Sequence, residues 1–305
     1  MPRLPVSSEP ASGPNEIGEL RAPARSGPAW ALVRTAVEAA LHIGAGIQRL
    51  SVSEGDGLAP ALTRKQFLAR IDTANCLEIG PFDCPLVRDP GVRYFDVLDT
   101  AALEDRSRRH GRPPGAVPRI DYVSPTGDLT IVDRRFASVV SSHVIEHQPD
   151  LLAHLKAVAA LLEPGGRYYV ICPDKRYCCD HFNPVSELPE VLAAHEERRR
   201  VHTAASIRAQ LESATHNVAL GHWLGIHGRP IAERDPEAVR IADANCARAE
   251  RGEYVDVHAW AFTDATFREL IGEVCAQGGV PLAIDYVTRT RFGALEFFAA
   301  LRRTA

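Results

Sequence analysis

Residues Asn75–Thr100, NCLEIGPFDCPLVRDPGVRYFDVLDT, decide the fold of this chain. A β-prone apolar run over residues 76–79 leads into a tight Gly-Pro turn, and a short crossover connects it to a second predicted strand over residues 93–98 that ends in acids. A strand, a crossover and another strand form the opening half of a doubly wound α/β domain.

Two carboxylates stand at the ends of these strands. Glu78 and Asp96 lie eighteen positions apart, near the spacing at which an acid reaches a ribose diol in dinucleotide-type sites. Ligands of such sheets bind outside the carboxyl ends of the strands, so we expect both acids in one crevice. Acids at strand ends also cap helices, but the pairing with Gly80 on consecutive strands favours a ligand site.

The loop after the first strand argues against a diphosphate ligand. A phosphate cradle needs several backbone N–H donors and closely spaced glycines. After Gly80 the loop reads Pro81-Phe82-Asp83-Cys84-Pro85, and each proline removes a donor. The sequence therefore predicts a ligand that contains a ribose without a diphosphate.

Five segments occur in a fixed order from residue 74 to the C-terminus. They are LEIGP (Leu77–Pro81), Y-x-D (Tyr94–Asp96), SHVIEH (Ser142–His147), PDKRY (Pro173–Tyr177) and DVHAW (Asp256–Trp260). In these segments the chain resembles the class I S-adenosylmethionine-dependent methyltransferases, and most closely a bacterial branch of them. It departs from the wider superfamily in having one glycine in the first loop.

The resemblance implies an α/β fold with a doubly wound, mostly parallel, seven-stranded Rossmann-like sheet, and S-adenosylmethionine as cofactor. It implies that Glu78 supports the first loop and the ammonium of the methionine moiety, and that Asp96 accepts hydrogen bonds from the ribose hydroxyls. Asp121 is the candidate for the adenine amino group. The cofactor-binding set expected on this basis is Glu78, Gly80, Pro81, Asp96, Asp121, Ser142 and His143.

Composition limits the other function classes. The 305 residues are 45% hydrophobic, enough for a full core, and are long for a bare sheet domain, so an insertion is expected. A net charge of −4 gives no sign of the excess positive charge that is typical of nucleic-acid-binding proteins. Seven cysteines without CxxC spacing favour a reducing cytosol. No secretory signal or membrane span is predicted, and the oligomeric state is left open, a homodimer included.

The chain is predicted to have three parts. Residues 1–28 read as a disordered tail, and residues 29–72 as N-terminal helices that either cover the cofactor crevice or pack on the core, with packing favoured. Residues 73–305 read as the methyltransferase domain. Within that domain, helix-like stretches without a strong strand predict a helical substrate insertion at about 180–253.

Further strands and helices complete the predicted sheet. Strands are expected over residues 119–123, 136–142 and 167–172, with a helix from Asp150 that ends in a Pro-Gly-Gly turn. A helix over residues 263–275, with Thr263 as N-cap, precedes a terminal hairpin of residues 281–288 and 294–301.

The SHVIEH segment follows the fourth strand and faces the same crevice. His143 or His147 is a candidate general base for a hydroxyl acceptor, because an imidazole titrates near neutral pH. A second reading makes His143, Glu146 and His147 a divalent metal site, similar to the Glu-His pair of small-RNA 2′-O-methyltransferases. A third reading gives the segment a packing role. We expect no metal.

Candidate acceptor contacts follow the fifth strand and lie in the insertion. Lys175 and Arg176 offer donors to a carboxylate, a phosphate or a sugar hydroxyl, and Tyr177 lies beside them. His222 and Trp223, in HNVALGHWLGIHG, suggest a wall for an apolar or sugar face.

The segment YVDVHAWAF, residues 254–262, closes the insertion. Strand alternation would place Asp256, His258 and Trp260 on one face with two further aromatics. One reading is a buried Asp-His pair that fixes the insertion. The other makes His258 a catalytic candidate, with His143 and His147, and places Trp260 in the acceptor pocket.

These features predict a cytosolic methyltransferase that acts on a small molecule, first on an oxygen of a sugar or other polar metabolite. Methylation of an amine or of a natural-product scaffold is the alternative within enzymes. From another class, the chain could be a non-catalytic S-adenosylmethionine-binding subunit that scaffolds a partner. An NAD-dependent oxidoreductase is disfavoured by the prolines of the first loop.

Overall fold

The computed structural model describes Gly44, residues 56–112 and residues 115–304. All of them belong to one compact unit, Gly44–Ala305. The predicted tail 1–28 lies outside the described residues, and so do residues 29–43 and 45–55 of the predicted N-terminal helices.

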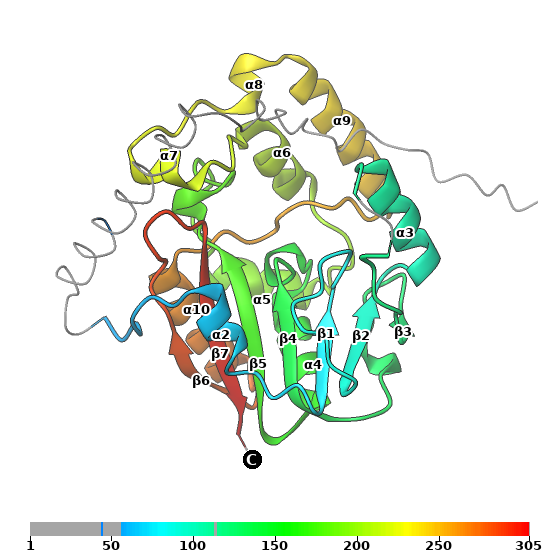
Figure 1. Ribbon diagram of the computed structural model, residues 1–305. Coiled ribbons are helices and arrows are strands. Elements are labelled where there is room, and N and C mark those ends of the chain that lie inside the picture. The colour runs from blue at the N-terminus through cyan, green and yellow to red at the C-terminus, as the bar shows by residue number, and fades with distance from the viewer. Residues whose placement is uncertain (1–43, 45–55, 113–114, 305) are drawn as a thin grey trace, which may run out of the picture. The chain divides into compact units, whose positions relative to one another are not determined.

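The core of this unit is one seven-stranded sheet with the order β3-β2-β1-β4-β5-β7-β6 (Figure 1). Strands β1 to β5 pair in parallel, and β7 runs antiparallel to both β5 and β6. The predicted doubly wound, mostly parallel α/β sheet is confirmed. The strands are β1 (Cys76–Ile79), β2 (Val92–Asp96), β3 (Tyr122–Val123), β4 (Phe136–Ser142), β5 (Leu162–Pro173), β6 (Leu282–Val287) and β7 (Glu296–Arg303).

The fifth strand differs from its prediction. It begins at Leu162, five residues before the expected start, so the predicted Pro-Gly-Gly turn lies inside the strand. The pairing with β4 shifts register there, between Phe136 and Ser138. Gly165 has a φ of +78°, and a Cβ on Gly166 would stand 3.0 Å from the Ala137 oxygen. The two glycines therefore form a bulge that keeps the strand paired.

Helices begin where the sequence offers a side-chain cap. Thr63 caps α2, Asp99 caps α3, Asp150 caps α4 and Thr263 caps α10, each accepting a hydrogen bond from a backbone N–H of the first turn. The N-cap predicted at Thr263 is confirmed, with a full capping box. The bounds are α2 (Arg64–Leu68), α3 (Thr100–Arg109), α4 (Leu151–Leu161) and α10 (Asp264–Gly278).

Apolar side chains cover both faces of the sheet. On one face, Phe67 of α2 packs with Cys76, Val140 and Phe298. The other face packs against α4, α10 and α5 (Leu188–Glu196), which lie together behind the sheet in Figure 1. This burial on both sides explains why β1 and β4 read as continuous apolar runs in the sequence.

The predicted insertion is helical over its described length, but its first helix belongs to the sheet layer. Val191 and Ala194 of α5 are part of the main core. The remaining helices have a small core of their own, which includes Ile207, Cys246 and Val257. They lie beyond the carboxyl ends of the parallel strands (Figure 1) and are α6 (Ala204–Ser213), α7 (Ala219–Trp223), α8 (Ile231–Arg234) and α9 (Glu237–Glu250).

None of the helices in the described ranges is long and apolar enough to cross a bilayer.

Candidate active site

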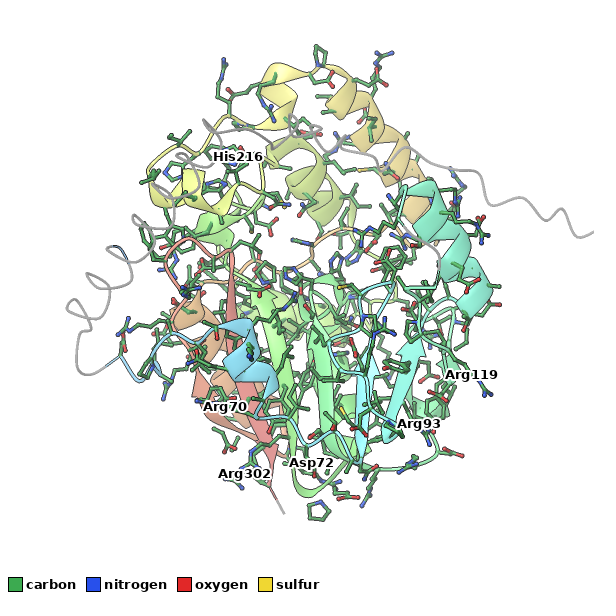
Figure 2. The ribbon with its side chains drawn as sticks, viewed as in Figure 1. Arg70, Asp72, Arg93, Arg119, His216 and Arg302 are labelled. Atoms are coloured by element: carbon green, nitrogen blue, oxygen red, sulfur yellow. The ribbon has the colours of Figure 1, made fainter. Side chains whose placement is uncertain are left out.

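The chain reverses direction across the sheet between β1 and β4. From β1 it proceeds outward to β2 and β3, and it then returns to the other side of β1 to form β4 and β5. Ligands of open α/β sheets bind at such a switch point, outside the carboxyl ends of the strands. Figure 2 shows His216 in the insertion, beyond the carboxyl ends of the strands, while Asp72 and Arg93 lie at the opposite edge of the sheet, where β1 and β2 begin.

Gly80 ends β1 at the switch point. Its N–H donates to the Phe95 oxygen of β2 over 2.9 Å, and its φ is +70°. A Cβ at this position would stand 2.8 Å from Cγ2 of Val144, in the segment after β4. Gly80 thus brings the first loop against the ends of both neighbouring strands, in a conformation that favours glycine.

Glu78 of β1 binds the same loop. Its buried carboxylate accepts hydrogen bonds from the N–H groups of Leu86, over 2.7 Å, and Val87, over 3.3 Å. Burial raises the pKa of this carboxyl to about 7, although the two backbone donors act in the opposite direction. These hydrogen bonds give Glu78 a geometric basis for its predicted support of the first loop. Its contact with the ammonium of the methionine moiety stays a prediction.

Asp96 is the last residue of β2 and is 7% exposed. Its Oδ1 accepts the Leu98 N–H over 3.2 Å. Burial raises the pKa of the carboxyl, and backbone donors, including the Phe82 N–H of the first loop, oppose that shift. Asp96 and the first loop therefore share one edge of the sheet, as expected for a ribose contact.

The backbone donors of the first loop are already engaged. The N–H of Gly80 binds Phe95, that of Cys84 binds the Pro81 oxygen, and those of Leu86 and Val87 bind Glu78. A bound diphosphate would have to displace these hydrogen bonds. The geometry agrees with the expectation of a donor without a diphosphate.

Two further predicted cofactor contacts have partners inside the protein. The exposed Asp121 accepts the Tyr94 N–H over 3.0 Å, within the body of the strand pair rather than at its end. Ser142 ends β4 and accepts a hydrogen bond of 2.9 Å from the Arg64 guanidinium. The adenine contact by Asp121 stays a prediction.

His143 follows β4 in a left-handed conformation, with a φ of +54°. Non-glycine residues in this region are strained, and such strain is concentrated at functional sites. Its Nε2 lies 3.1 Å from Oε2 of Glu296, and its Nδ1 lies 3.5 Å from Oε1 of Glu146. Burial acts to lower the pKa of His143, but the two carboxylates outweigh it and raise the pKa.

Glu146 is the centre of this region. Its side chain is fully buried, and among the described residues neither carboxylate oxygen has a hydrogen-bond partner. A ligand atom of His147 and one of His258 lie within 4.8 Å of a Glu146 oxygen and of each other. A buried carboxylate without a hydrogen bond costs free energy, so the imidazoles of His143, His147 and His258 around it point to a role that packing alone does not explain.

The two histidines beside Glu146 are each oriented by a carboxylate. His258 Nδ1 lies 2.6 Å from Oδ2 of Asp180, and His147 Nδ1 lies 3.0 Å from Oδ1 of Asp256. The imidazole rings of His147 and His258 meet edge to face at 4.6 Å. Burial acts to lower the pKa of His258, but the Asp180 carboxylate dominates and raises it to about 10.

The YVDVHAWAF segment keeps its predicted alternation in its first half. Val255 and Val257 are buried in the core of the insertion, while Asp256 and His258 face His147. Asp256 and His258 have different partners, so the expected pair between them is not formed. The alternation ends after His258, because Trp260, Ala261 and Phe262 are all buried.

Glu146, His147 and His258 suit a divalent ion better than His143, Glu146 and His147, the metal site considered from the sequence. That set joined Glu146 and His147 to His143, whereas in the structure Glu146 and His147 converge with His258. A metal-ligating histidine commonly gives its second ring nitrogen to a carboxylate or carbonyl. Both His147 and His258 have such a carboxylate at Nδ1, which leaves Nε2 of each for a ligand.

The predicted acceptor contacts after β5 are engaged within the protein. Arg176 binds Asp174 through two nitrogens, over 2.9 and 2.5 Å, and Asp264 over 2.7 Å. Lys175 donates to the His181 oxygen over 3.0 Å, and burial lowers the pKa of its amine. With these contacts Arg176 balances the charge of two buried carboxylates.

The aromatic candidates lie in two places. Tyr177 stacks on Trp223 at 3.9 Å, which joins the segment after β5 to the insertion. Trp260 is buried and donates to the Gln148 oxygen over 2.6 Å. Trp260 also borders a cavity of about 430 Å³ between α5 and α6, together with His202 and Arg199.

Three polar residues of the site carry no local sequence signal. Asp180, Glu296 and Arg64 are far in the chain from the histidines and the serine that they contact. Asp180 follows the PDKRY segment by only three residues, and that proximity is the one hint that the sequence offers.

No protein-family model and no curated protein matches the chain. Solved structures similar to it are methyltransferases. The CcbJ methyltransferase from Streptomyces caelestis is 14% identical, with 83% of this chain and 94% of that chain covered and a TM-score of 0.41. An S-adenosylmethionine-dependent methyltransferase from Clostridium acetobutylicum is 10% identical, with 88% and 100% covered and a TM-score of 0.38.

An O-methyltransferase family protein from Burkholderia thailandensis is 12% identical, with 78% of this chain and 53% of that chain covered and a TM-score of 0.35. Similarity this distant does not transfer an activity. We therefore derive the function from the geometry of the chain itself.

Proposed function

We propose that this chain is an S-adenosylmethionine-dependent methyltransferase acting on a small-molecule acceptor. Our preferred acceptor atom is an oxygen of a sugar or other polar metabolite. One observation carries the proposal: at the switch point between β1 and β4, the Gly80 loop, the buried Asp96 carboxylate and the strained His143 meet at one edge of the sheet.

The donor would lie across the carboxyl ends of β1 and β2. Asp96 would accept hydrogen bonds from the ribose hydroxyls, because its carboxylate lies at a strand end. Gly80 and Pro81 would pass beside the methionine moiety, and Glu78 would hold that loop in place. Engaged N–H groups in the loop support a donor that brings no diphosphate.

The chemistry required of the protein is limited, because the sulfonium of the donor is already an activated leaving group. The protein has to align the acceptor oxygen with the methyl carbon and accept the hydroxyl proton. We assign to Nε2 of His147 the role of accepting the proton of the acceptor hydroxyl. Its Nδ1 faces the Asp256 carboxylate at 3.0 Å, whereas the pKa of His258, raised to about 10, keeps a proton on that ring near neutral pH.

His258 then has a positioning and electrostatic role. It lies between Asp180 and Glu146, two buried carboxylates, and as an imidazolium it balances their charge. Trp260 would line the acceptor pocket from the cavity that it borders. Trp223, His222 and Tyr177 would form the outer wall of the acceptor pocket.

Metal-assisted methyl transfer is the second candidate, favoured by the unpaired Glu146 oxygens. Glu146, His147 and His258 would hold a divalent ion, and such an ion would act as a Lewis acid that lowers the pKa of the acceptor hydroxyl. Asp180 and Asp256 would orient the two imidazoles through their Nδ1 atoms in either case.

An amine or a natural-product scaffold is the alternative acceptor, and a non-catalytic donor-binding subunit is the alternative class. A strong base is not needed for an amine, so loss of His147 would then have little effect. A scaffold subunit would bind the donor without turnover. The histidines around Glu146 favour catalysis on an oxygen.

Titration calorimetry and a methyl-transfer screen test the proposal. S-adenosylmethionine and its demethylated product should bind to the purified chain, and a labelled methyl group should pass to a compound in a pool of polar metabolites. Binding of NAD without any response to S-adenosylmethionine would refute the assignment. Donor binding without transfer to any pool would leave the scaffold alternative.

All seven cysteines are unpaired in the structure. Cys84 in the first loop is exposed and Cys179 after β5 is partly exposed, and an oxidising compartment would favour unwanted pairing of such thiols. We infer from this that the enzyme works in the cytosol.

A further inference from the structure

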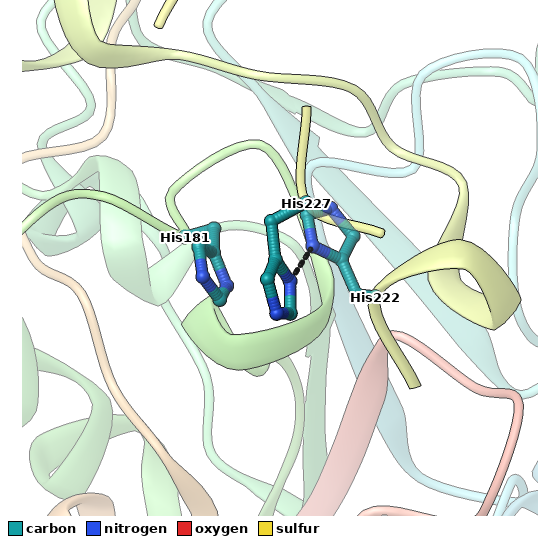
Figure 3. Close-up of side chains that lie close together, drawn as sticks. All are labelled: His181, His222 and His227. Atoms are coloured by element: carbon teal, nitrogen blue, oxygen red, sulfur yellow. Dashed lines mark hydrogen bonds between the residues drawn. The ribbon is translucent and has the colours of Figure 1, made fainter. Parts of the chain in front are cut away.

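Three histidines meet in the insertion, in a group separate from the one around Glu146. His181 follows the PDKRY segment, His222 lies on α7, and His227 lies in the loop after α7 (Figure 3). One ligand nitrogen of each ring lies within 4.8 Å of the other two. The rings of His181 and His227 stack at 3.8 Å, and His222 Nδ1 lies 3.1 Å from His227 Nδ1.

Two of these rings have a fixed tautomer. His181 Nδ1 lies 3.0 Å from the Arg176 oxygen, and His222 Nε2 lies 2.9 Å from the His216 oxygen. A carbonyl oxygen only accepts, so each of these nitrogens carries hydrogen. In the neutral rings the lone pair therefore lies on the opposite nitrogen, which is Nε2 of His181 and Nδ1 of His222.

This arrangement matches the outer shell of metal-binding histidines. Such residues donate their second ring N–H to a backbone carbonyl or a carboxylate, which fixes the tautomer and the ring orientation. Burial lowers the pKa of both His181 and His222, which favours the neutral form of each ring. A neutral imidazole is the form that binds a metal ion.

The spacing of one nitrogen pair agrees with a shared ion, and the stacked His181 ring has to turn to aim its lone pair at that ion. Two imidazole nitrogens bound to zinc at 2.0–2.1 Å with a tetrahedral angle lie about 3.4 Å apart. The Nδ1 atoms of His222 and His227 are 3.1 Å apart in the structure. Without an ion, the His227 N–H donates to His222. When an ion binds, His227 changes tautomer: solvent takes the proton from Nδ1 and returns one to Nε2, and Nδ1 of the neutral ring supplies the third lone pair.

We propose that His181, His222 and His227 form a binding site for a divalent transition-metal ion, with Zn²⁺ the preferred occupant. Three imidazoles leave a fourth position for water or another small ligand. The ion would join the segment after β5 to the α7 loop. The same junction already has hydrogen bonds from Thr215 N to the Cys179 oxygen and from Cys179 N to Asn217 Oδ1.

Direct metal binding tests the proposal. The full chain, without a polyhistidine tag, is freed of metal by a chelator and titrated with Zn²⁺ by calorimetry and with Co²⁺ by visible absorption. The titrations use a Glu146→Gln, Cys179→Ser background, which removes one ligand from each of the two other candidate groups, Glu146–His147–His258 and Cys178–Cys179–Asp180. We expect one ion per chain, a tetrahedral Co²⁺ spectrum and a higher melting temperature with Zn²⁺.

Variants identify the ligands. His222→Ala, and separately the half-buried His181→Gln, should each weaken Zn²⁺ binding by at least roughly tenfold and remove the thermal shift. His216→Ala is the matched control. That histidine lies in the same loop, and both of its ring nitrogens are used by backbone groups, so the affinity should be retained.

A folded His181→Gln chain with unchanged Zn²⁺ affinity would overturn the proposal. So would the absence of stoichiometric binding to the parent chain, which would leave a histidine cluster held by hydrogen bonds alone. Equal loss of binding in His216→Ala and in the ligand variants would also contradict the assignment, because His216 is not a proposed ligand. Circular dichroism checks that each variant is folded.

Discussion

The Asp180 carboxylate and the His258 imidazole join the two ends of the helical insertion through a hydrogen bond of 2.6 Å. Their side chains are only 2% and 16% exposed. Burial alone would raise the pKa of Asp180 and lower that of His258, but each group shifts in the opposite direction because the partner charge dominates. This ion pair therefore holds the two ends of the insertion together, and its strength depends on the charge of His258 beside Glu146.

We expect His258→Asn to lower stability in a pH-dependent way. The amide replaces the Nδ1 donor but carries no charge, so the variant loses the charge pair, with a cost on the order of 3 kcal/mol near pH 6. The pKa of His258 is about 10 in the folded chain, against an ordinary value of 6.5. The stabilisation is complete below about pH 6.5 and is lost as the pH rises through 10.

Denaturant unfolding of both proteins at pH 6, 8 and 10 measures this difference. The gap between wild type and His258→Asn should narrow with each step. A gap that stays constant across the series would mean that the imidazole is not charged in the folded chain.

Gly80→Ala should be more harmful than an alanine at another left-handed glycine. Both Gly80 and Gly111 have positive φ, so alanine costs roughly 1–2 kcal/mol of backbone strain at either position. At Gly80 the new Cβ would also meet Val144 at 2.8 Å, whereas nothing lies within 4 Å of the position at Gly111.

Thermal unfolding and donor titration of the two glycine variants provide the test. Gly80→Ala should show the larger fall in melting temperature and weaker binding of S-adenosylmethionine. Equal effects of the two substitutions would contradict a close approach of the first loop to the segment after β4.

Asp96→Ala should weaken binding of S-adenosylmethionine by roughly 1–3 kcal/mol, because charge-assisted hydrogen bonds to the ribose hydroxyls would be lost. Calorimetry measures the loss directly. Asp121→Ala is the informative companion, since its carboxylate already accepts the Tyr94 N–H. A loss at Asp121 and none at Asp96 would move the donor away from the end of β2.

The sequence predicted the sheet well because its signals are local. The bounds of β1 and β4 follow from short apolar runs, and the start of α10 follows from the Thr263 cap. β5 was predicted, but its start was placed five residues too late, because a Pro-Gly-Gly run usually forms a turn and only pairing with β4 shows that here it forms a bulge.

The electrostatic partners of the site could not be read from spacing. Asp180 and His258 are 78 residues apart, and Arg176 and Asp264 are 88 residues apart. A sequence shows that such groups are present, but their pairing depends on how the insertion folds over the sheet. Arg176 was for this reason expected at the substrate, whereas the structure places it between two buried acids.

Arg176→Met should destabilise the chain. Asp174 and Asp264 are almost fully buried, and loss of the guanidinium would leave both carboxylates without their main charge partner. Removing one member of a buried ion pair costs roughly 3–5 kcal/mol, and the 41% exposure of Arg176 places the expected loss at about 2–3 kcal/mol.

Denaturant unfolding checks that loss against Arg167→Met, which removes a pair with Asp285 that is more open to solvent. The control should change stability by less than about 1 kcal/mol. If Arg176→Met is as stable as wild type but binds acceptor more weakly, the original substrate role of Arg176 would regain support.

His147→Gln should separate catalysis from donor binding. Loss of a general base lowers turnover by roughly 10²–10⁴-fold. The affinity for S-adenosylmethionine should be nearly unchanged, because the proposed donor contacts lie on β1 and β2. His195→Gln is the matched control: its Nδ1 also faces a carboxylate, that of Asp150 at 2.9 Å, but it lies on α5 in the sheet layer.

Chelation distinguishes the two readings of His147. With a general base, turnover of the wild-type enzyme should survive exhaustive treatment with a chelator, and this is the result that we expect. With an ion held by Glu146, His147 and His258, turnover should disappear and return when a divalent metal is added. Glu146→Gln then decides the matter, because it removes an anionic ligand from the ion but leaves the His147–Asp256 contact in place.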